Sequence, residues 1–221
     1  MRNILMSLEN LLFAHRPECN FDTSKQSHVL ILPGMLGSVS RVFPLVNFLR
    51  RHQSKYAITA IPQGLSIAGF EALIDAAYVR IQERLLSKTS VKEIIIFGHS
   101  HGGRVACVLS KRLKSPQVRL SIVTAGSPLV LKPRGLSWFR RVFYSLFSQA
   151  FREWPLIGQP EGDSIQTYIG YYSDTDRVVD SESAKHGHQG ELRQLDGFSH
   201  TDFINAQKMG PILLSFLKEI G

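Results

Sequence analysis

The chain has 221 residues, a hydrophobic content of 43% and a formal net charge of +8 at neutral pH. That length suits one domain with a sizeable core, and neither a linker nor a repeat divides it. Two cysteines are too few for a disulfide framework, and no apolar run reaches the roughly 18 residues of a membrane span. The composition therefore argues against a disulfide-stapled module, a repeat protein and an integral membrane protein.

Residues 1–17 carry leucines at helical spacing, but Glu9 and Asn10 interrupt the apolar stretch. This pattern predicts an amphipathic helix rather than a signal peptide, whose apolar segment would be continuous. We therefore expect a cytoplasmic protein, either soluble or bound peripherally to a membrane.

Apolar runs alternate with runs of helical periodicity from residue 28 onward. The apolar runs predict strands at 28–32, 56–61, 91–97, 120–125, 164–172 and 192–195. The periodic runs predict helices at 38–51, 66–86, 101–113 and 203–220. Such alternation is typical of an α/β fold with a mostly parallel sheet of about six strands and helices on both faces.

The sequence Gly-His-Ser-His-Gly at residues 98–102 joins the third predicted strand to the helix that follows it. A serine between two glycines at such a junction is typical of a nucleophile elbow, a turn so tight that the serine adopts strained backbone angles. Ser100 is therefore the candidate nucleophile, with its hydroxyl held above the sheet where a carbonyl carbon can approach it.

A serine hydroxyl is a weak nucleophile at neutral pH, so a histidine must accept its proton and a carboxylate must orient that histidine. The carboxyl ends of parallel strands meet at one edge of the sheet, so an acid and a histidine that follow later strands can lie beside the serine. Asp176 and His200 occupy such positions, and the expected catalytic residues are Ser100, Asp176 and His200.

Alternatives remain for both partners of the serine. Asp174 and Asp180 lie close to Asp176, which we favour because the apolar pair 178–179 should anchor its turn in the core. His186 and His188 lie in the polar stretch 185–190, which we expect to be an exposed loop, so we favour His200 as the base.

The developing oxyanion needs hydrogen-bond donors, and the residue after the nucleophile, His101, supplies one backbone N–H. Met35, directly after the flexible Gly34 of the first strand-to-helix loop, is the candidate for the second. The alternative is that residues 33–38 form only a helix-capping turn. We expect no proton transfer from the His99 and His101 side chains. We also expect no metal binding by them, because the elbow splays them apart.

These motifs resemble those of the α/β-hydrolase superfamily, in particular compact bacterial lipases and esterases and GPI inositol-deacylase-like hydrolases. The resemblance covers nearly the whole chain from residue 28 and rests on Leu-Pro-Gly-Met-Leu-Gly-Ser at 32–38, Gly-His-Ser-His-Gly-Gly at 98–103, Ala-Gly-Ser-Pro at 125–128, Asp-Arg-Val-Val at 176–179 and Ser-His-Thr-Asp at 199–202. It implies a compact α/β-hydrolase fold that lacks the first antiparallel hairpin of the full fold.

The one long stretch outside the alternation is an insertion at about 130–162 in a single domain spanning 1–221. Aromatic residues at steps of three and four predict an amphipathic helix over 137–154. Its apolar face forms either a lid over the active site or a core helix covering the sheet, and both interpretations imply an apolar pocket. Leu36, Phe143 and Phe147 are the candidate substrate contacts.

We therefore predict a serine hydrolase that cleaves carboxylic esters with an apolar acyl part, as a lipase or esterase, through an acyl-enzyme and without a cofactor or metal. The alternatives are an acyl-thioesterase and a non-catalytic lipid- or partner-binding module on the same fold.

Charge suggests where such a protein works. Residues 101–155 hold ten of the 26 basic and one of the 18 acidic residues. Such a block attracts anionic lipid, although an ordinary solvated surface can have the same composition. No nucleic-acid-binding motif accompanies it. The expected partners are an ester or lipid substrate and, peripherally, an anionic membrane, with no nucleic acid.

Overall fold

The computed structural model describes residues 21–34, 39–61, 70–87, 90–113, 115, 117–129, 160, 165–186 and 188–221. The described residues form six strands in one fully parallel sheet of order β2-β1-β3-β4-β5-β6. The strands are β1 (Ser27–Leu32), β2 (Tyr56–Ala60), β3 (Glu93–His99), β4 (Arg119–Ala125), β5 (Ile165–Tyr172) and β6 (Glu191–Gln194). The predicted six-stranded parallel sheet is confirmed.

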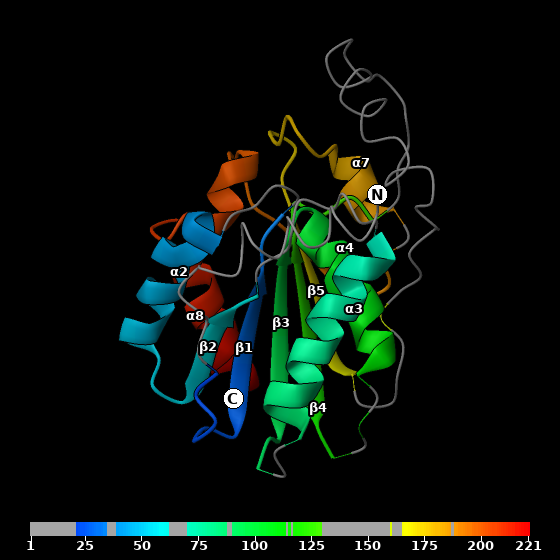
Figure 1. Ribbon diagram of the computed structural model, residues 1–221. Coiled ribbons are helices and arrows are strands. Elements are labelled where there is room, and N and C mark those ends of the chain that lie inside the picture. Colours follow the sequence, from blue (N-terminus) through cyan, green and yellow to red (C-terminus); the bar gives the residue numbers. More distant parts are fainter. Residues whose placement is uncertain are drawn as a thin grey trace.

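Helices cover both faces of this sheet (Figure 1). α3 and α4 pack on one face, and α2 and α8 on the other. The helical segments are α2 (Val39–His52), α3 (Phe70–Ile81) with its π-helical continuation η1 (Gln82–Leu86), α4 (His101–Arg112), α7 (Ser181–Lys185), the 3-10 segment η2 (His200–Ile204) and α8 (Met209–Ile220).

The central strand β3 explains why the sheet needs helices on both sides. Successive side chains of a strand point to opposite faces. Ile94 and Ile96 pack in the apolar layer beneath α3 and α4, whereas Ile95 and Phe97 pack in the layer beneath α2 and α8. All four are fully buried, as an apolar run without alternation predicts.

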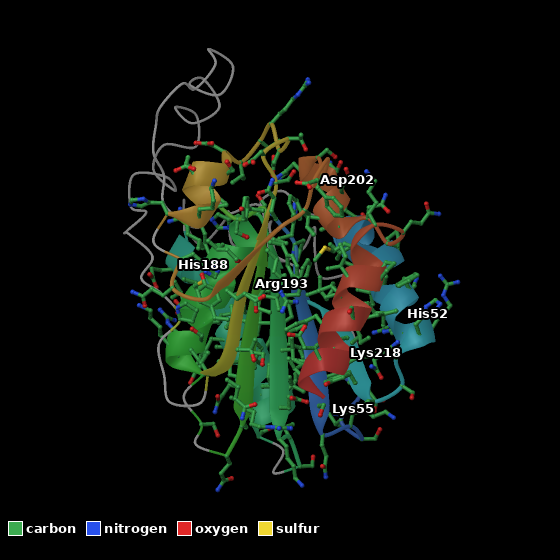
Figure 2. The ribbon with its side chains drawn as sticks, turned by 180° about the vertical axis from the view of Figure 1, so that it is seen from behind. His52, Lys55, His188, Arg193, Asp202 and Lys218 are labelled. Carbon is green, nitrogen blue, oxygen red and sulfur yellow. The ribbon has the colours of Figure 1, made fainter. Side chains whose placement is uncertain are left out.

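At the edge of the sheet, charged side chains join β6 to α8. Arg193 of β6 binds Glu191 at 2.6 Å and Glu219 of α8 at 2.9 Å. Figure 2 shows this face from behind, with Arg193 beside α8. The contact links the last helix to the edge strand.

The structure differs from the prediction in two segments. The helix predicted at 203–220 is broken, because the Asn205 side chain accepts hydrogen bonds from the N–H groups of Gln207 and Lys208, which makes a turn between η2 and α8. The short helix α7 was not predicted. It begins where the Asp180 side chain accepts the N–H of Glu182.

Several predictions lie outside the described residues. They are the N-terminal helix at 1–17, the insertion at 130–162 apart from Pro160, the helix at 137–154, and the positions of Met35, Leu36, Phe143 and Phe147. The described strands all end at one edge of the sheet, the upper one in Figure 1, and the candidate residues that the structure describes follow those ends.

Candidate functional site

The turn after β3 has the conformation of a nucleophile elbow. Ser100 has φ 53° and ψ −123°, and it is the one non-glycine residue with positive φ in the described part of the chain. An L-residue adopts such angles only where its surroundings enforce them. Here the Ser100 N–H donates to the carbonyl of Ala125 at the end of β4, at 2.9 Å.

The glycines of the elbow are required by close packing between the strand and α4. A Cβ at Gly98 would lie 2.4 Å from the Gly102 carbonyl oxygen, and a Cβ at Gly103 would lie 2.0 Å from the Ser127 Oγ. Real Cβ atoms do not approach other atoms so closely. The glycines therefore let α4 begin directly above the strand, with its N-terminal N–H groups and the positive end of its dipole beside Ser100.

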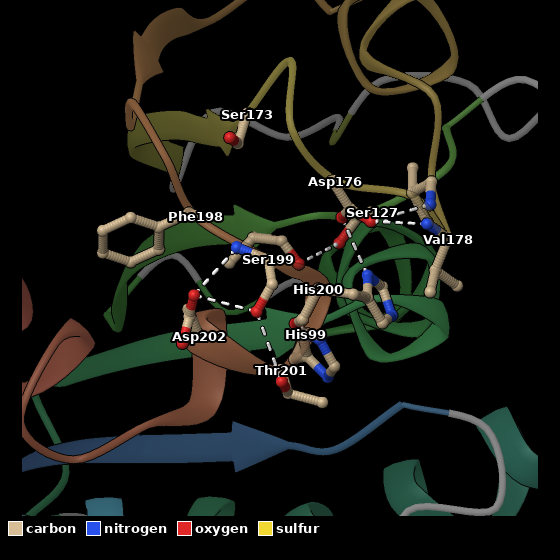
Figure 3. A network of polar contacts seen from close by, with 12 residues as sticks. His99, Ser127, Ser173, Asp176, Val178, Phe198, Ser199, His200, Thr201 and Asp202 are labelled. Carbon is tan, nitrogen blue, oxygen red and sulfur yellow. Dashed lines mark hydrogen bonds and ion pairs between the residues drawn. The ribbon is translucent and has the colours of Figure 1, made fainter.

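The structure brings Asp176 and His200 together (Figure 3). Asp176 lies in the turn after β5, and His200 is the first residue of η2, which follows β6. The Nδ1 of His200 lies 2.8 Å from Asp176 Oδ2. A carboxylate accepts only, so Nδ1 carries the proton and the Nε2 of His200 keeps its lone pair to accept another.

Backbone donors hold the Asp176 carboxylate in place. Its Oδ1 accepts the N–H of Val178 at 2.8 Å and the N–H of Val179 at 3.0 Å. The side chain of Asp176 is only 1% exposed, and that of His200 is 14% exposed. The pair is therefore shielded and oriented, with the imidazole within reach of solvent or substrate.

The other two carboxylates near Asp176 have structural contacts. Asp174 is exposed and accepts a hydrogen bond from the Gln194 side chain at 3.2 Å. Asp180 is exposed and caps α7. Neither has the buried, oriented position of Asp176.

The alternative histidines lie elsewhere. His186 directly follows α7 in the sequence and is exposed. The prediction of an exposed loop is wrong for His188, because its ring stacks on Tyr168 of β5 with ring centroids 3.9 Å apart. This packing leaves His188 half-buried, and burial lowers its pKa to about 4. A group with that pKa is a poor proton acceptor at neutral pH.

The loop after β1 approaches the nucleophile directly. A Cβ at Gly34 would lie 3.0 Å from the Cβ of Ser100. This places the start of the predicted oxyanion loop against Ser100, whereas Met35 itself lies outside the described residues. The side chain of His101, on the other side of the elbow, is buried, and burial lowers its pKa to about 3.

Sequence reasoning missed the residues that hold the His200 loop. Asp202 accepts hydrogen bonds from the Ser199 N–H and Oγ, both at 2.8 Å, and pairs with Lys208 at 2.8 Å. Thr175 Oγ1 donates to the Phe198 carbonyl at 3.0 Å. The signal for the first contact was present, because Ser-x-x-Asp before a helical segment is a capping-box pattern.

A surface cavity of about 700 Å³ opens beside this loop, between η2 and α2. Its lining is mixed, and it consists of Arg41, Pro44, Thr201, Ile204, Asn205, Ala206 and Gln207. Within the described ranges no three His, Cys, Asp or Glu side chains gather as a metal site requires. None of the helices described is both long and apolar enough to cross a bilayer.

Comparison with known proteins adds a family and a fold. Residues 51–174, more than half of the chain, match the family model of a PGAP1-like alpha/beta domain. A search of curated protein sequences found no match.

Solved structures resemble most of the chain. The RedJ thioesterase from the prodiginine biosynthetic pathway of Streptomyces coelicolor is 19% identical, with a TM-score of 0.60 over 95% of this chain and 98% of its own. A lipase-esterase related protein from Clostridium acetobutylicum is 14% identical, with a TM-score of 0.63 over 88% and 96%. A soluble variant of monoglyceride lipase from Saccharomyces cerevisiae is 14% identical, with a TM-score of 0.60 over 91% and 88%.

At these identities the solved structures establish a common fold, and the match to the family model assigns the chain to one family with that fold. The predicted α/β-hydrolase resemblance is confirmed. The chain belongs to the PGAP1-like alpha/beta domain family of the α/β-hydrolase superfamily.

Proposed function

We propose that the protein is a serine hydrolase that cleaves carboxylic esters with an apolar acyl part, as a lipase or esterase does. The single observation that carries this proposal is the hydrogen bond of 2.8 Å between His200 Nδ1 and the buried carboxylate of Asp176, at the same edge of the sheet as the strained Ser100. Esterases, lipases and thioesterases among the similar structures support the same class of reaction.

In the proposed reaction, His200 Nε2 accepts the Ser100 hydroxyl proton while Oγ attacks the ester carbonyl carbon. Asp176 fixes the tautomer of His200 and stabilises the imidazolium that forms. The backbone N–H groups of His101 and Met35 stabilise the oxyanion, an effect typically worth a few kcal/mol for each donor. The tetrahedral intermediate expels the alcohol, which takes the proton from His200, and leaves the acyl group on Ser100.

Water completes the proposed cycle. His200 Nε2 accepts a proton from a water molecule whose oxygen attacks the acyl carbon. The second tetrahedral intermediate then releases the carboxylic acid and returns the proton to Ser100. The acyl chain would contact Leu36, Phe143 and Phe147. The predicted helix at 137–154 would form either a lid over the site or a core helix covering the sheet, and as a lid it would also contact an anionic membrane.

Replacement of Ser100 by alanine tests the proposal. Wild-type protein should hydrolyse p-nitrophenyl esters, and Ser100→Ala should abolish this activity, whereas the matched control Ser87→Ala, at the end of η1, should keep it. A fluorophosphonate probe should label Ser100 in the wild type, because labelling requires an activated serine. A folded Ser100→Ala variant with unchanged activity would end the proposal.

A second candidate function is acyl-thioester hydrolysis, which the same three residues would catalyse. The similarity to the RedJ thioesterase favours it over other reactions of this fold. Oxygen esters and thioesters of matched acyl length separate the two activities by their kcat/KM ratio. A protein that hydrolyses neither and does not react with the probe would instead be a lipid- or partner-binding module.

A further inference from the structure

His99, the residue before the proposed nucleophile, contacts the His200 loop although 101 positions separate the two histidines. The Nε2 of His99 lies 3.0 Å from the carbonyl oxygen of His200. The two rings also touch, with centroids 4.6 Å apart and planes inclined by 45° (Figure 3). A carbonyl oxygen only accepts hydrogen bonds, so the His99 Nε2 carries a proton and is the donor in this hydrogen bond.

The other side of the His99 ring faces the first strand-to-helix loop. A Cβ at Gly34 would lie 3.3 Å from the His99 Nδ1. The imidazole therefore lies between the loop that follows β1 and the loop that carries His200, and its own backbone leads directly into Ser100. Three segments that are distant in sequence meet on this one ring.

His99 is held neutral in this position. Burial, and then the nearby positive charge that His200 can carry, lower its pKa to about 3. A neutral ring neither competes with His200 for the serine proton nor repels the imidazolium that forms during the reaction. It keeps the N–H donor aimed at the His200 carbonyl throughout the pH range in which an esterase works.

The contact supplies what the carboxylate alone does not. Asp176 holds one ring nitrogen of His200, and a ring held at one point can still swing about that hydrogen bond. The donor from His99 fixes the backbone of His200, at the opposite end of the residue from Asp176. Two anchors at opposite ends of His200 define where its Nε2 lies.

We propose that His99 is a positioning residue for His200, in that its Nε2–H holds the His200 backbone so that the imidazole stays between Asp176 and Ser100. This inference rests on the proposed ester hydrolysis. A displacement of about 1 Å in a catalytic group can reduce the rate by about 100-fold without weakening substrate binding. The expected signature is therefore a lower kcat at an unchanged KM.

Three variants of His99 separate the donor from the ring. His99→Gln places an amide N–H at nearly the same distance from the backbone as Nε2, His99→Asn is one methylene too short, and His99→Phe keeps a ring without a donor. For a p-nitrophenyl ester, the Asn and Phe variants should lose about 10- to 100-fold in kcat with KM unchanged. The Gln variant should recover at least about tenfold of that loss.

The outcomes are distinct from those that test the function itself. If Ser100→Ala keeps full activity, the proposed function fails whatever the His99 variants do. If the wild type is active and Ser100→Ala is not, a Gln variant no better than the Asn variant overturns the positioning role. Equal activity of all three variants and the wild type overturns it as well. Should the Phe variant not fold, the Gln–Asn comparison still decides.

Discussion

Two side-chain clusters, each containing one histidine, lie along the same strand, β5, and they differ in what surrounds the imidazole. Beyond the end of β5, His200 faces the buried carboxylate of Asp176. In the middle of β5, His188 stacks on Tyr168, whose hydroxyl lies 3.7 Å from the Cys107 sulfur. The first histidine has an oriented acid. The second has an aromatic ring and a thiol.

The environment of the second cluster keeps every group in it uncharged. Burial lowers the pKa of His188 to about 4, raises the pKa of Cys107 to about 12 and also raises the pKa of Tyr168. Within this cluster a histidine, a thiol and a phenol lie in contact, yet none is ready to exchange a proton at neutral pH. Proximity of reactive side chains is therefore not enough, and an oriented charge partner separates a candidate active site from a packed polar core.

The largest expected effect comes from removing His200, whereas removing His188 should have almost none. His200→Ala should lower kcat for ester hydrolysis by about 10⁵-fold or more, because the proposed general base is lost. His188→Gln should change kcat less than about twofold, because the pKa of His188, about 4, makes this ring a poor proton acceptor at neutral pH. Steady-state kinetics with a p-nitrophenyl ester measure both, and comparable losses in the two variants would break the contrast between the clusters.

The next effect tests the carboxylate. Asp176→Asn should lower kcat by about 10⁴-fold, because the amide favours the wrong tautomer of His200. Asp174→Asn, two residues earlier on the exposed side of the turn, is the matched control and should stay within about twofold of the wild type. If Asp174→Asn lowered kcat more than Asp176→Asn, Asp174 would be the carboxylate that orients His200.

A smaller effect concerns acid stability. The folded-state pKa of His188 is about 4 and its unfolded value is near 6.5, so the unfolded chain binds more protons between these values. Stability is therefore lost as the pH falls from 6.5 to 4. His188→Gln lacks this group, so its Tm should fall less over that range, by about 2–4 °C, roughly 1 kcal/mol after discounting the solvent-exposed part of the ring.

The control for that measurement is His52→Gln, which replaces an exposed histidine at the end of α2. Its Tm should follow the pH dependence of the wild type. Equal acid sensitivity of the wild type and the His188 variant would mean that the ring is not buried as described.

The smallest effect concerns the thiol. In a Cys19→Ser background, native protein at pH 8 should not react with a disulfide reagent, because Cys107 is 1% exposed and burial raises its pKa to about 12. The thiol should react fully once the chain is denatured. Rapid reaction of folded protein would show that the second cluster is open, and the contrast with the first would be weaker than described.

Periodicity along the chain was sufficient to predict the sheet, because a parallel strand buried on both faces leaves a short continuous apolar run such as 94–97. It was not sufficient at 203–220. The apolar spacing continues through Asn205, but a side-chain hydrogen bond to the following N–H groups ends the helix there. A side chain that competes with the helix for backbone N–H groups does not change the spacing of the apolar residues, so the hydrophobic pattern does not reveal it.

The candidate site shows a similar division. We favoured Asp176 on the expectation that the apolar pair after it would anchor the turn. Val179 is buried, but Val178 is 56% exposed, and the N–H groups of both residues bind the carboxylate. The stacking of His188 on Tyr168 and the contact of His99 with His200 join residues distant in sequence, so only the folded chain brings them together.

The positive φ of Ser100 has a consequence for the evolution of this position in the sequence. A glycine would adopt the same backbone angles without strain, whereas any other residue loses on the order of 1 kcal/mol or more of folding free energy there. Selection for thermal robustness alone would favour glycine at position 100, and a requirement for chemistry would favour serine. Under the proposed function, stability and activity are thus in direct opposition at this residue.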